Sequence, residues 1–136
     1  MKPENRFLNR LKPKLEKQLR WYVEKMNNPY RSGTPDWYVE WFGRDGKCGM
    51  GWIEAKFWEI KTRDKVSAHK LVDKCSPLQL DWLLRTSNNC INAGILCGFP
   101  DTKVAAFTPF PIVNDNVPVV PIPELIKQLQ QWANNE

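Results

Sequence analysis

Apolar residues recur at spacings of three and four near the start of the chain, which is the pattern of a helix with one buried face. The apolar positions there are Phe7, Leu8, Leu11 and Leu15. They predict a helix over residues 3–12, with Pro3 in its first turn. Pro13 is expected to end or kink this helix, and residues 14–19 are a candidate continuation beyond the kink.

Two later stretches carry the same periodicity. The Ser76–Pro77 pair suits a helix cap followed by a first turn, and it predicts a helix that extends to about residue 88. The inner face of this helix is expected to hold Leu78, Trp82 and Leu83. A last amphipathic helix is predicted from Glu124 to about Trp132, with an apolar face made of Leu125, Ile126, Leu129 and Trp132.

Runs of aromatic and β-branched residues predict five strands, at residues 20–26, 36–42, 51–60, 95–99 and 104–107. An Asp-Gly pair within residues 43–47 predicts a hairpin turn between the second and third strands. Residues 27–35 have the composition of a loop, residues 62–75 that of a polar and basic surface excursion, and residues 109–121 that of a proline-punctuated linker or edge segment. The order helix, three strands, helix, two strands, helix indicates an α/β domain around one mixed sheet.

Composition narrows the class of protein. A chain of 136 residues is expected to form one domain, with enough length to bury a core without disulfides. Hydrophobic residues make up 42% and charged residues 26%, which argues against disorder. No apolar run approaches a membrane span, and the start of the chain lacks the apolar run of a signal peptide. We therefore expect a cytoplasmic location, in the host cytoplasm if a phage encodes the chain, and no membrane partner.

Cysteine and histidine usage argues against two kinds of site. The cysteines are Cys48, Cys75, Cys90 and Cys97. None forms a CxxC pair, and the single His69 has no cysteine at zinc-ligand spacing, so a structural zinc site is not expected. We expect four reduced thiols. Nucleophilic catalysis by serine or cysteine is also disfavoured, because His69 would have to be the base.

Two carboxylates and a lysine are expected to meet on one face of the predicted sheet. Asp36 opens the second strand, and Glu54 and Lys56 lie on the third, on the far side of the hairpin. Side chains two residues apart on a strand point to the same face. Clustered carboxylates are costly unless a cation lies between them, and oxygen ligands favour Mg²⁺ or Mn²⁺. Such an ion would activate a water against a phosphodiester, and Lys56 would orient that water or stabilise negative charge.

A second carboxylate–lysine pair, Glu59 and Lys61, follows closely. Its strand parity is opposite to that of Glu54 and Lys56, so only one pair can share the face of Asp36. We favour Glu54 and Lys56 because they follow directly on the hairpin. The alternative without chemistry is that these charges form the solvated face of an antiparallel sheet.

The element that separates these alternatives is Gly33-Thr34-Pro35-Asp36, followed by Ile53-Glu54-Ala55-Lys56 and then by Gln79 in a helix. This series resembles the PD-(D/E)xK nuclease superfamily, and most closely its VRR-NUC group, which includes small stand-alone phage members. The resemblance covers about residues 4–108 and implies a restriction-endonuclease-like core of helix, three strands, helix and strand. It also implies a divalent-metal-dependent hydrolase of DNA phosphodiester bonds. The implied metal ligands are Asp36, Glu54 and the backbone carbonyl of Ala55, with Lys56 as the catalytic lysine and Gln79 as a supporting polar residue.

The same family places a glutamate in the first helix, facing the metal, and Glu4 and Glu16 are the candidates here. The apolar residues of this helix cluster within about 60° of Glu4, whereas Glu16 is turned about 120° away and follows Pro13. A glutamate within an apolar stripe needs a partner, and a metal ion would be one. We therefore favour Glu4 as a further metal ligand. The alternative is an exposed glutamate near the positive end of the helix dipole.

Basic and polar residues around the expected site are candidates for contacts with DNA phosphates. They are Arg31, Ser32, Lys61, Arg63, Lys65, His69 and Lys70. Together with the first helix they would form a basic rim around an acidic site, although a solvated surface loop is an equally open interpretation of residues 62–75. The net charge of +5 fits a polyanionic partner such as nucleic acid but does not require one.

The chain holds seven tryptophans, and strand parity divides four of them. Trp37 and Trp41 share the face opposite Asp36 and are expected in the core. Trp52 and Trp58 share the face of Glu54 and are candidates to flank the site. Trp132 and its helix either pack on the domain or form a dimer seam.

These features predict an endonuclease that uses Mg²⁺, or Mn²⁺ as a substitute, within residues 1–108, followed by a proline-rich segment and C-terminal helix in residues 109–136. A core of this size has little surface for sequence readout. We therefore expect action on branched DNA such as four-way (Holliday) junctions, by a stand-alone homodimer without a small-molecule cofactor. Two alternatives stay open: a general nicking or DNA-degrading nuclease of phage DNA metabolism, and a non-catalytic nucleic-acid-binding module on the same fold.

Overall fold

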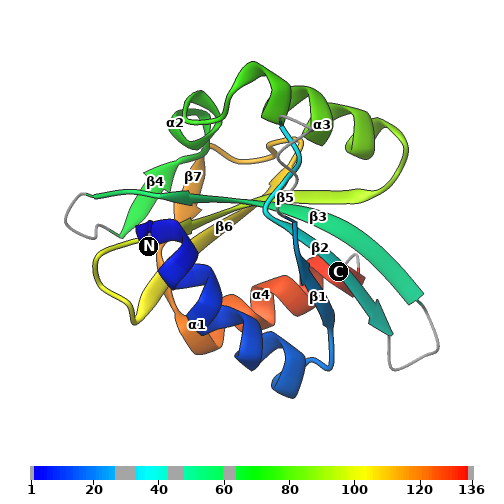
Figure 1. Ribbon diagram of the computed structural model, residues 1–136. Helices are drawn as coiled ribbons and strands as arrows, with labels where there is room; N and C mark the ends of the chain where they lie inside the picture. The colour runs from blue at the N-terminus through cyan, green and yellow to red at the C-terminus, as the bar shows by residue number, and fades with distance from the viewer. Residues whose placement is uncertain (1, 27–32, 43–47, 60–63, 135–136) are drawn as a thin grey trace.

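A six-stranded mixed sheet runs through the computed structural model, in the order β1-β2-β3-β5-β6-β8, and helices cover both of its faces (Figure 1). The structure describes residues 2–26, 33–42, 48–59 and 64–134. Neighbouring strands are antiparallel except β3 and β5, which run parallel. The predicted class, an α/β protein with one mixed sheet flanked by helices, is confirmed.

The strands of the sheet are β1 (Tyr22–Lys25), β2 (Trp37–Phe42), β3 (Cys48–Phe57), β5 (Asn92–Gly98), β6 (Val104–Phe110) and β8 (Val120–Pro121). A separate antiparallel pair consists of β4 (Lys65–Ser67) and β7 (Asn116–Pro118). The helices are α1 (Pro3–Gln18), α2 (Ala68–Asp73), α3 (Pro77–Asn88) and α4 (Ile122–Asn134). The series α1, β1, β2, β3, α3, β5 is the order expected for the core, with β4 and α2 inserted before α3.

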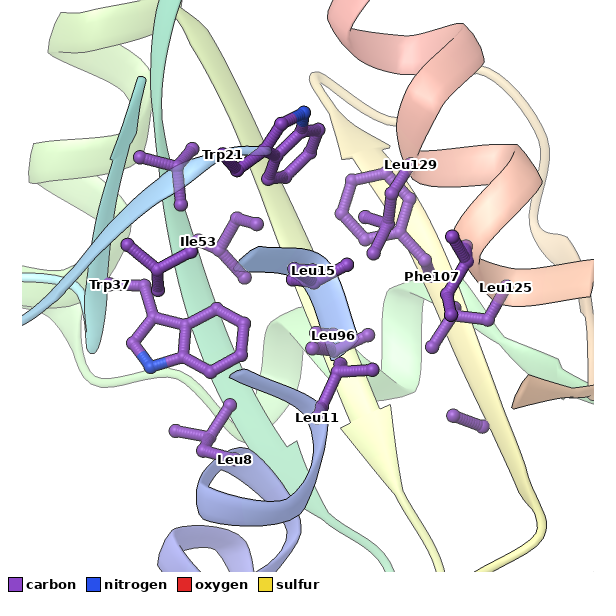
Figure 2. Close-up of a cluster of buried hydrophobic side chains, with 14 of the residues drawn as sticks. Leu8, Leu11, Leu15, Trp21, Trp37, Ile53, Leu96, Phe107, Leu125 and Leu129 are labelled. Carbon is purple, nitrogen blue, oxygen red and sulfur yellow. The ribbon is translucent and has the colours of Figure 1, made fainter. Parts of the chain in front are cut away.

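Hydrophobic burial fixes the helices to both faces of the sheet. Helices α1 and α4 cover one face, where Leu15 and Leu129 share a buried cluster with Trp37 and Phe107 of the sheet (Figure 2). Helices α2 and α3, with the β4–β7 pair, lie on the other face (Figure 1), where Leu83 and Ile95 belong to a second buried cluster. Each of these side chains is almost fully buried, and such burial contributes roughly 1.5–3 kcal/mol per residue.

Helix α1 runs from Pro3 to Gln18 with Pro13 inside it, so the expected end at residue 12 is wrong and the continuation beyond it is confirmed. A proline in a helix interior costs about 3 kcal/mol or more, because it removes one backbone hydrogen bond and its ring crowds the preceding turn. Leu11 and Leu15, on either side of it, are 2% and 0% exposed. Burial of the two leucines contributes about 3–6 kcal/mol, which is of the size needed to offset the cost of the proline.

Residues 62–75 were expected to be a polar surface excursion, and this is wrong for their described part. Residues 64–75 include β4 and α2, and they add Val66, Ala68, Leu71 and Cys75 to the cluster on the α3 side of the sheet. Three of these residues have helical spacing. A helix of six residues is too short for periodicity to separate it from a loop.

The other differences concern the ends of elements. Strand β3 begins at Cys48, three residues before the predicted start, and β6 extends to Phe110. The proline-punctuated segment contains β7 and the edge strand β8, so the prediction of an edge segment is confirmed for β8. Leu78, expected on the inner face of its helix, is 52% exposed. The predicted hairpin turn at 43–47 and most of the loop at 27–35 lie outside the described residues.

The aromatic residues of the core lie mainly under α4. Trp37 and Trp41 are buried, as predicted. The Trp132 ring lies 5.6 Å from that of Trp41 and 5.2 Å from that of Phe107, centroid to centroid. Trp132 and α4 therefore pack on the domain. Among the described helices, none has the length and the hydropathy that a bilayer crossing requires.

Candidate active site

The segment that precedes β2 packs against the first turn of α3. Gly33 has a φ of +88°, a conformation that residues with a side chain rarely adopt. A Cβ added at Gly33 would lie 2.6 Å from the carbonyl carbon of Leu78, so a larger residue does not fit without a shift of backbone. Pro35 is buried, and Asp36 follows it directly. The Gly-x-Pro-Asp element therefore fixes the point at which Asp36 enters the sheet.

Asp36 and Glu54 lie opposite each other on neighbouring strands. The antiparallel ladder pairs Trp37 with Ile53, and one step further along the same register places Asp36 across from Glu54. Residues that face each other across a ladder project from the same side of the sheet. The Asp36 carboxylate also accepts a hydrogen bond from the backbone N–H of Ala55, with an N···Oδ2 distance of 2.8 Å. The structure thus brings the two carboxylates together.

Glu54 is 1% exposed, and within the described residues its Oε2 has no hydrogen-bond partner. Burial raises the pKa of Glu54, and the hydrogen bond and negative charge of Asp36 raise it further, whereas Lys56 lowers it. A buried carboxylate with one oxygen unpartnered and a second carboxylate beside it is unfavourable as an anion. A proton or a cation between the two carboxylates relieves this cost, so the pair suits a divalent metal ion.

Lys56 is held in place from the start of α3. Its Nζ donates to Oε1 of Gln79 at 2.9 Å. The same Oε1 accepts from the backbone N–H of Ser76 at 2.8 Å, and the Ser76 hydroxyl in turn accepts from the backbone N–H of Gln79 at 3.2 Å. These two reciprocal bonds form a capping box at the N-terminus of α3. The cap of the helix therefore also orients the lysine.

Glu4 reaches the same neighbourhood from α1. It is half-buried in the first turn, and its negative charge contributes to the raised pKa of Glu54. Glu16, the alternative, is exposed. In the described part of the chain, no three carboxylate, histidine or cysteine side chains are close enough to one another to hold a metal ion by themselves. Glu4 therefore lies near the pair of carboxylates without being part of a preformed three-residue cluster.

The rival pair occupies a different place. Glu59 follows the end of β3 and is exposed, whereas Glu54 is buried beside Asp36. Lys61 lies outside the described residues.

Cys75 and Ser76 belong to the site although sequence reasoning gave them no role in it. The Cys75 thiol is 8% exposed, and burial raises its pKa to about 11; the charge of Lys56 opposes this shift, whereas Glu54 and Asp36 add to it. The thiol therefore lies close to the three charged groups as a neutral, apolar wall. The Ser-x-x-Gln spacing of a capping box is visible in the sequence, but nothing in the spacing shows that Gln79 also meets Lys56.

Aromatic rings lie beside the charged groups. Trp52, two residues before Glu54 on the same face of β3, has its ring centroid 5.1 Å from Tyr38 and 5.3 Å from Trp82. Trp58 lies under the ammonium of Lys74, 5.0 Å from its ring centroid.

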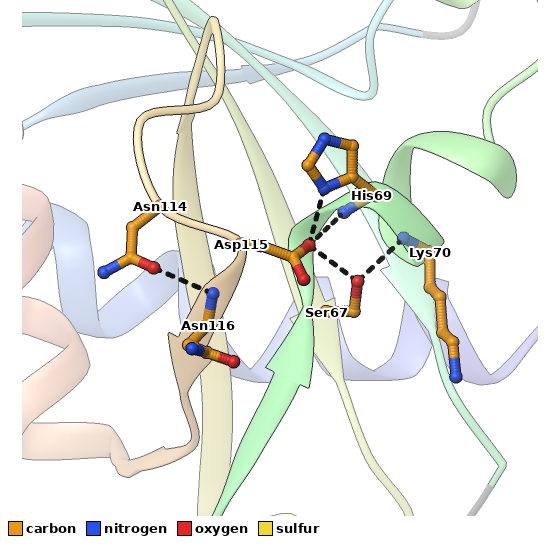
Figure 3. Close-up of polar contacts among 6 residues, drawn as sticks. All are labelled: Ser67, His69, Lys70, Asn114, Asp115 and Asn116. Atoms are coloured by element: carbon orange, nitrogen blue, oxygen red, sulfur yellow. Dashed lines mark hydrogen bonds and ion pairs between the residues drawn. The ribbon is translucent and has the colours of Figure 1, made fainter.

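The residues expected to contact DNA divide into two groups. Arg31, Ser32, Lys61 and Arg63 lie outside the described residues, whereas Lys65, His69 and Lys70 are exposed. The Nδ1 atom of His69 lies 2.6 Å from Oδ1 of Asp115, which also accepts a hydrogen bond from the Ser67 hydroxyl at 2.7 Å (Figure 3). Hydrogen bonds from Ser67 and His69 hold the pKa of Asp115 well below its usual value. These contacts attach the segment before β7 to the start of α2.

Comparisons with known proteins give a remote likeness of structure and no match of sequence. No family model matches the chain, and no curated protein matches its sequence. Among solved structures, the chain is similar to Hjc, a Holliday junction resolvase from the archaeal hyperthermophile Archaeoglobus fulgidus, with a TM-score of 0.49 and 17% identity over 92% of each chain. At that level of likeness the function of this chain has to be argued from its own residues.

Proposed function

We propose that the chain is a Mg²⁺-dependent endonuclease that hydrolyses DNA phosphodiester bonds, as a VRR-NUC-like member of the PD-(D/E)xK superfamily. One observation carries this proposal: a buried carboxylate with an unpartnered oxygen, Glu54, lies opposite Asp36, on the face from which Lys56 bonds to Gln79. Two carboxylates with a fixed ammonium are the groups that metal-assisted phosphodiester hydrolysis needs.

The donor set fits a hard divalent cation. Asp36, Glu54 and the backbone carbonyl of Ala55 would be its ligands, all of them oxygen, with Glu4 as the further carboxylate nearby. When bound, such an ion lowers the pKa of a water molecule and screens the charge of a phosphate under attack.

Lys56 supplies the positive charge that belongs to the protein itself. Its bond to Gln79 keeps the ammonium in one position on the face of the carboxylates. A preorganised ammonium stabilises negative charge that develops on an attacked phosphate without reorganising during the reaction. Gln79 is then a positioning residue, because it acts through Lys56.

Branched DNA, and four-way junctions in particular, is the substrate we propose. The described residues form one six-stranded sheet, the helices that cover it and the short β4–β7 pair. Such a surface meets phosphates, which differ in arrangement between a junction and a linear duplex, more readily than it reads base edges. A junction presents pairs of equivalent strands, so we also propose a symmetric homodimer with two sites. Residues 1–108 would carry the chemistry, while residues 109–136 supply α4 and its packing.

Cleavage of a DNA panel tests this proposal. The panel is a four-way junction, a linear duplex and a single strand of the same sequence, each with Mg²⁺ and with EDTA. We expect Mg²⁺-dependent incision of the junction in preference to the other two, and a loss of at least about a hundredfold in Asp36→Asn. Asp81→Asn, which changes an exposed aspartate on α3, is the matched control.

Each outcome of the panel leads to a different conclusion about the function. Equal cleavage of junction and duplex would support a general nuclease and contradict the junction preference. Binding of DNA without cleavage by any preparation would support a non-catalytic module. Equal activity of Asp36→Asn and Asp81→Asn would overturn the assignment of the site.

A further inference from the structure

The solvent side of α1 carries a regular row of cations. Lys2, Arg6, Arg10 and Lys14 follow one another at every fourth position, and all four are exposed. Positions four apart lie on one face of a helix, so the four side chains form one ridge. The apolar residues that anchor α1 are buried against the sheet, and the four exposed cations lie outside that contact, with Phe7 and Leu11 beside Arg10 and Lys14 at one end of the row. The row is therefore free to face a partner.

These cations have no partner within the described protein. In residues 2–26, 33–42, 48–59 and 64–134, no carboxylate lies within ion-pair distance of Arg6, Arg10 or Lys14. Like charges four residues apart destabilise a helix by a few tenths of a kcal/mol per pair. The arrangement costs stability in the isolated chain, and an anionic partner would reverse that cost.

A groove runs beside the row. It consists of three adjoining hollows of about 360, 470 and 400 Å³. Glu4 lines the first hollow, which shares Phe57 with the second. The second shares Arg10 with the third, which is lined by Lys14 on one side and Lys103 on the other. This α1 groove therefore leads away from the candidate active site, between α1 and the turn that joins β5 to β6.

We propose that the α1 groove binds the phosphate backbone of a DNA arm that extends from the site of cleavage. The proposal rests on the proposed function and adds to it the path of the substrate. From Pro3, which follows Lys2, to Lys14 the helix rises about 16 Å, a length over which one strand of B-form DNA presents about five phosphates. Four cations at this spacing match that charge density, and Lys103 adds a fifth from the opposite wall.

Two acidic residues, Glu4 and Glu59, mark the end of the groove nearest the site. Glu59 lines both the first and the second hollow and is exposed. The phosphate contacts are therefore placed at Arg6, Arg10, Lys14 and Lys103, and the weakest contact is expected beside Glu59. Of the row on α1, Arg10 and Lys14 lie furthest from Glu4. Substitution of these two residues therefore tests binding in the groove without altering the residues proposed for catalysis.

Binding of a fluorescent four-way junction, measured by anisotropy in EDTA over a range of salt concentrations, tests the proposal. The variant is Arg10→Gln/Lys14→Gln, and the control is Lys25→Gln/Lys127→Gln, which removes the same charge at exposed positions on β1 and α4. We expect the slope of log affinity against log salt to fall by about 1.8 in the groove variant, or about 0.9 for each lost phosphate contact. At 0.1 M salt its affinity should be at least about tenfold weaker, and the control should match the wild type.

A salt slope in the groove variant equal to that of the wild type would overturn the proposal. An equal fall in slope in the groove variant and the control would also overturn it, because it would indicate a diffuse charge effect. If the groove instead binds an acidic protein segment, the groove variant should bind the junction with an unchanged salt slope. Circular dichroism of both variants verifies that they fold. Because EDTA prevents cleavage, a failed nuclease assignment leaves this binding result unchanged, and a failed groove leaves cleavage by the wild type unchanged.

Discussion

Glu54 is the residue on which the chemistry of the site most depends. It is buried on a central strand, next to Asp36, and its Oε2 has no partner in the described residues. A structural role alone would favour an apolar side chain at such a position, because an unpaired buried charge is unfavourable. A cation bound between Glu54 and Asp36 would compensate the buried negative charge and would explain a carboxylate at this position.

Replacing Glu54 with glutamine should stabilise the protein in the absence of metal. Burial and Asp36 raise the pKa of Glu54 above its ordinary value of 4.5, so the cost of the folded carboxyl group is absent below pH 4.5 and grows as the pH rises above it. In EDTA at pH 8, urea unfolding of Glu54→Gln should give a free energy of unfolding higher by on the order of 1–3 kcal/mol. Mg²⁺ should then stabilise the wild type and not the variant. A less stable variant that Mg²⁺ stabilises as much as the wild type would contradict this.

The sequence indicated Asp36, Glu54 and Lys56 because strand parity is a strict rule: alternate residues share a face. The sequence did not reveal the buried thiol of Cys75, because that contact depends on how α2 ends relative to β3. It also left open Glu4 against Glu16, and the structure separates them by exposure and by the charge effect of Glu4 on Glu54.

At the scale of elements, the N-terminus of α3 links folding to the candidate chemistry. Gln79 closes the capping box with Ser76 and also accepts the bond from Lys56. Gly33 packs against the first turn of the same helix, at Leu78. One helix end thus positions both the lysine and the segment that leads to Asp36.

Two cap variants should separate these roles. Ser76→Ala removes the acceptor for the backbone N–H of Gln79, whereas Gln79→Ala removes the acceptor for both the backbone N–H of Ser76 and the Lys56 ammonium. Each should lower the free energy of unfolding by about 1 kcal/mol. Only Gln79→Ala should lower kcat for junction cleavage further, by roughly ten- to a hundredfold, because the ammonium loses its fixed position. The same loss of kcat in both variants would show that Gln79 acts through the helix alone.

The stability that the contact between α2 and the segment before β7 contributes should decrease at acidic pH. Hydrogen bonds from Ser67 and His69 hold the pKa of Asp115 below its ordinary value of 3.8, so their contribution to stability is complete well above pH 3.8 and declines as the pH falls below it. Asp115→Asn should have a lower thermal midpoint than the wild type at pH 7, and the difference should narrow towards pH 3. Asp73→Asn, which changes an exposed residue of α2, is the control. A difference that is constant across this range would contradict the role of the carboxylate.

The elements themselves were predictable where their periodicity is long. The apolar stripes of α1 and α4 and the runs of β2 and β5 gave elements of the correct type. The proline rule failed at Pro13 because burial of its neighbours offsets a local penalty. Helix α2 was missed because six residues carry too little periodic signal.

On the scale of the whole molecule, the positive net charge is distributed around an acidic centre. Asp36 and Glu54 face each other on the sheet, while exposed cations line α1 and the turn before β6. The net charge of +5 could be counted in the sequence, but the groove could not be predicted, because it depends on how α1 lies against the β5–β6 turn. A DNA strand that lies along α1, with one phosphate at the two carboxylates, would use both the exposed cations and the acidic centre.

The central claim is that Asp36 and Glu54 together hold a divalent ion, and a calorimetric titration with Mn²⁺ tests it most directly. The wild type should bind Mn²⁺ with a saturable heat signal at pH 8, and Asp36→Asn and Glu54→Gln should each lose that signal, whereas Asp81→Asn should keep it. Absence of binding to the wild type, or binding by the two site variants equal to that of Asp81→Asn, would contradict the claim.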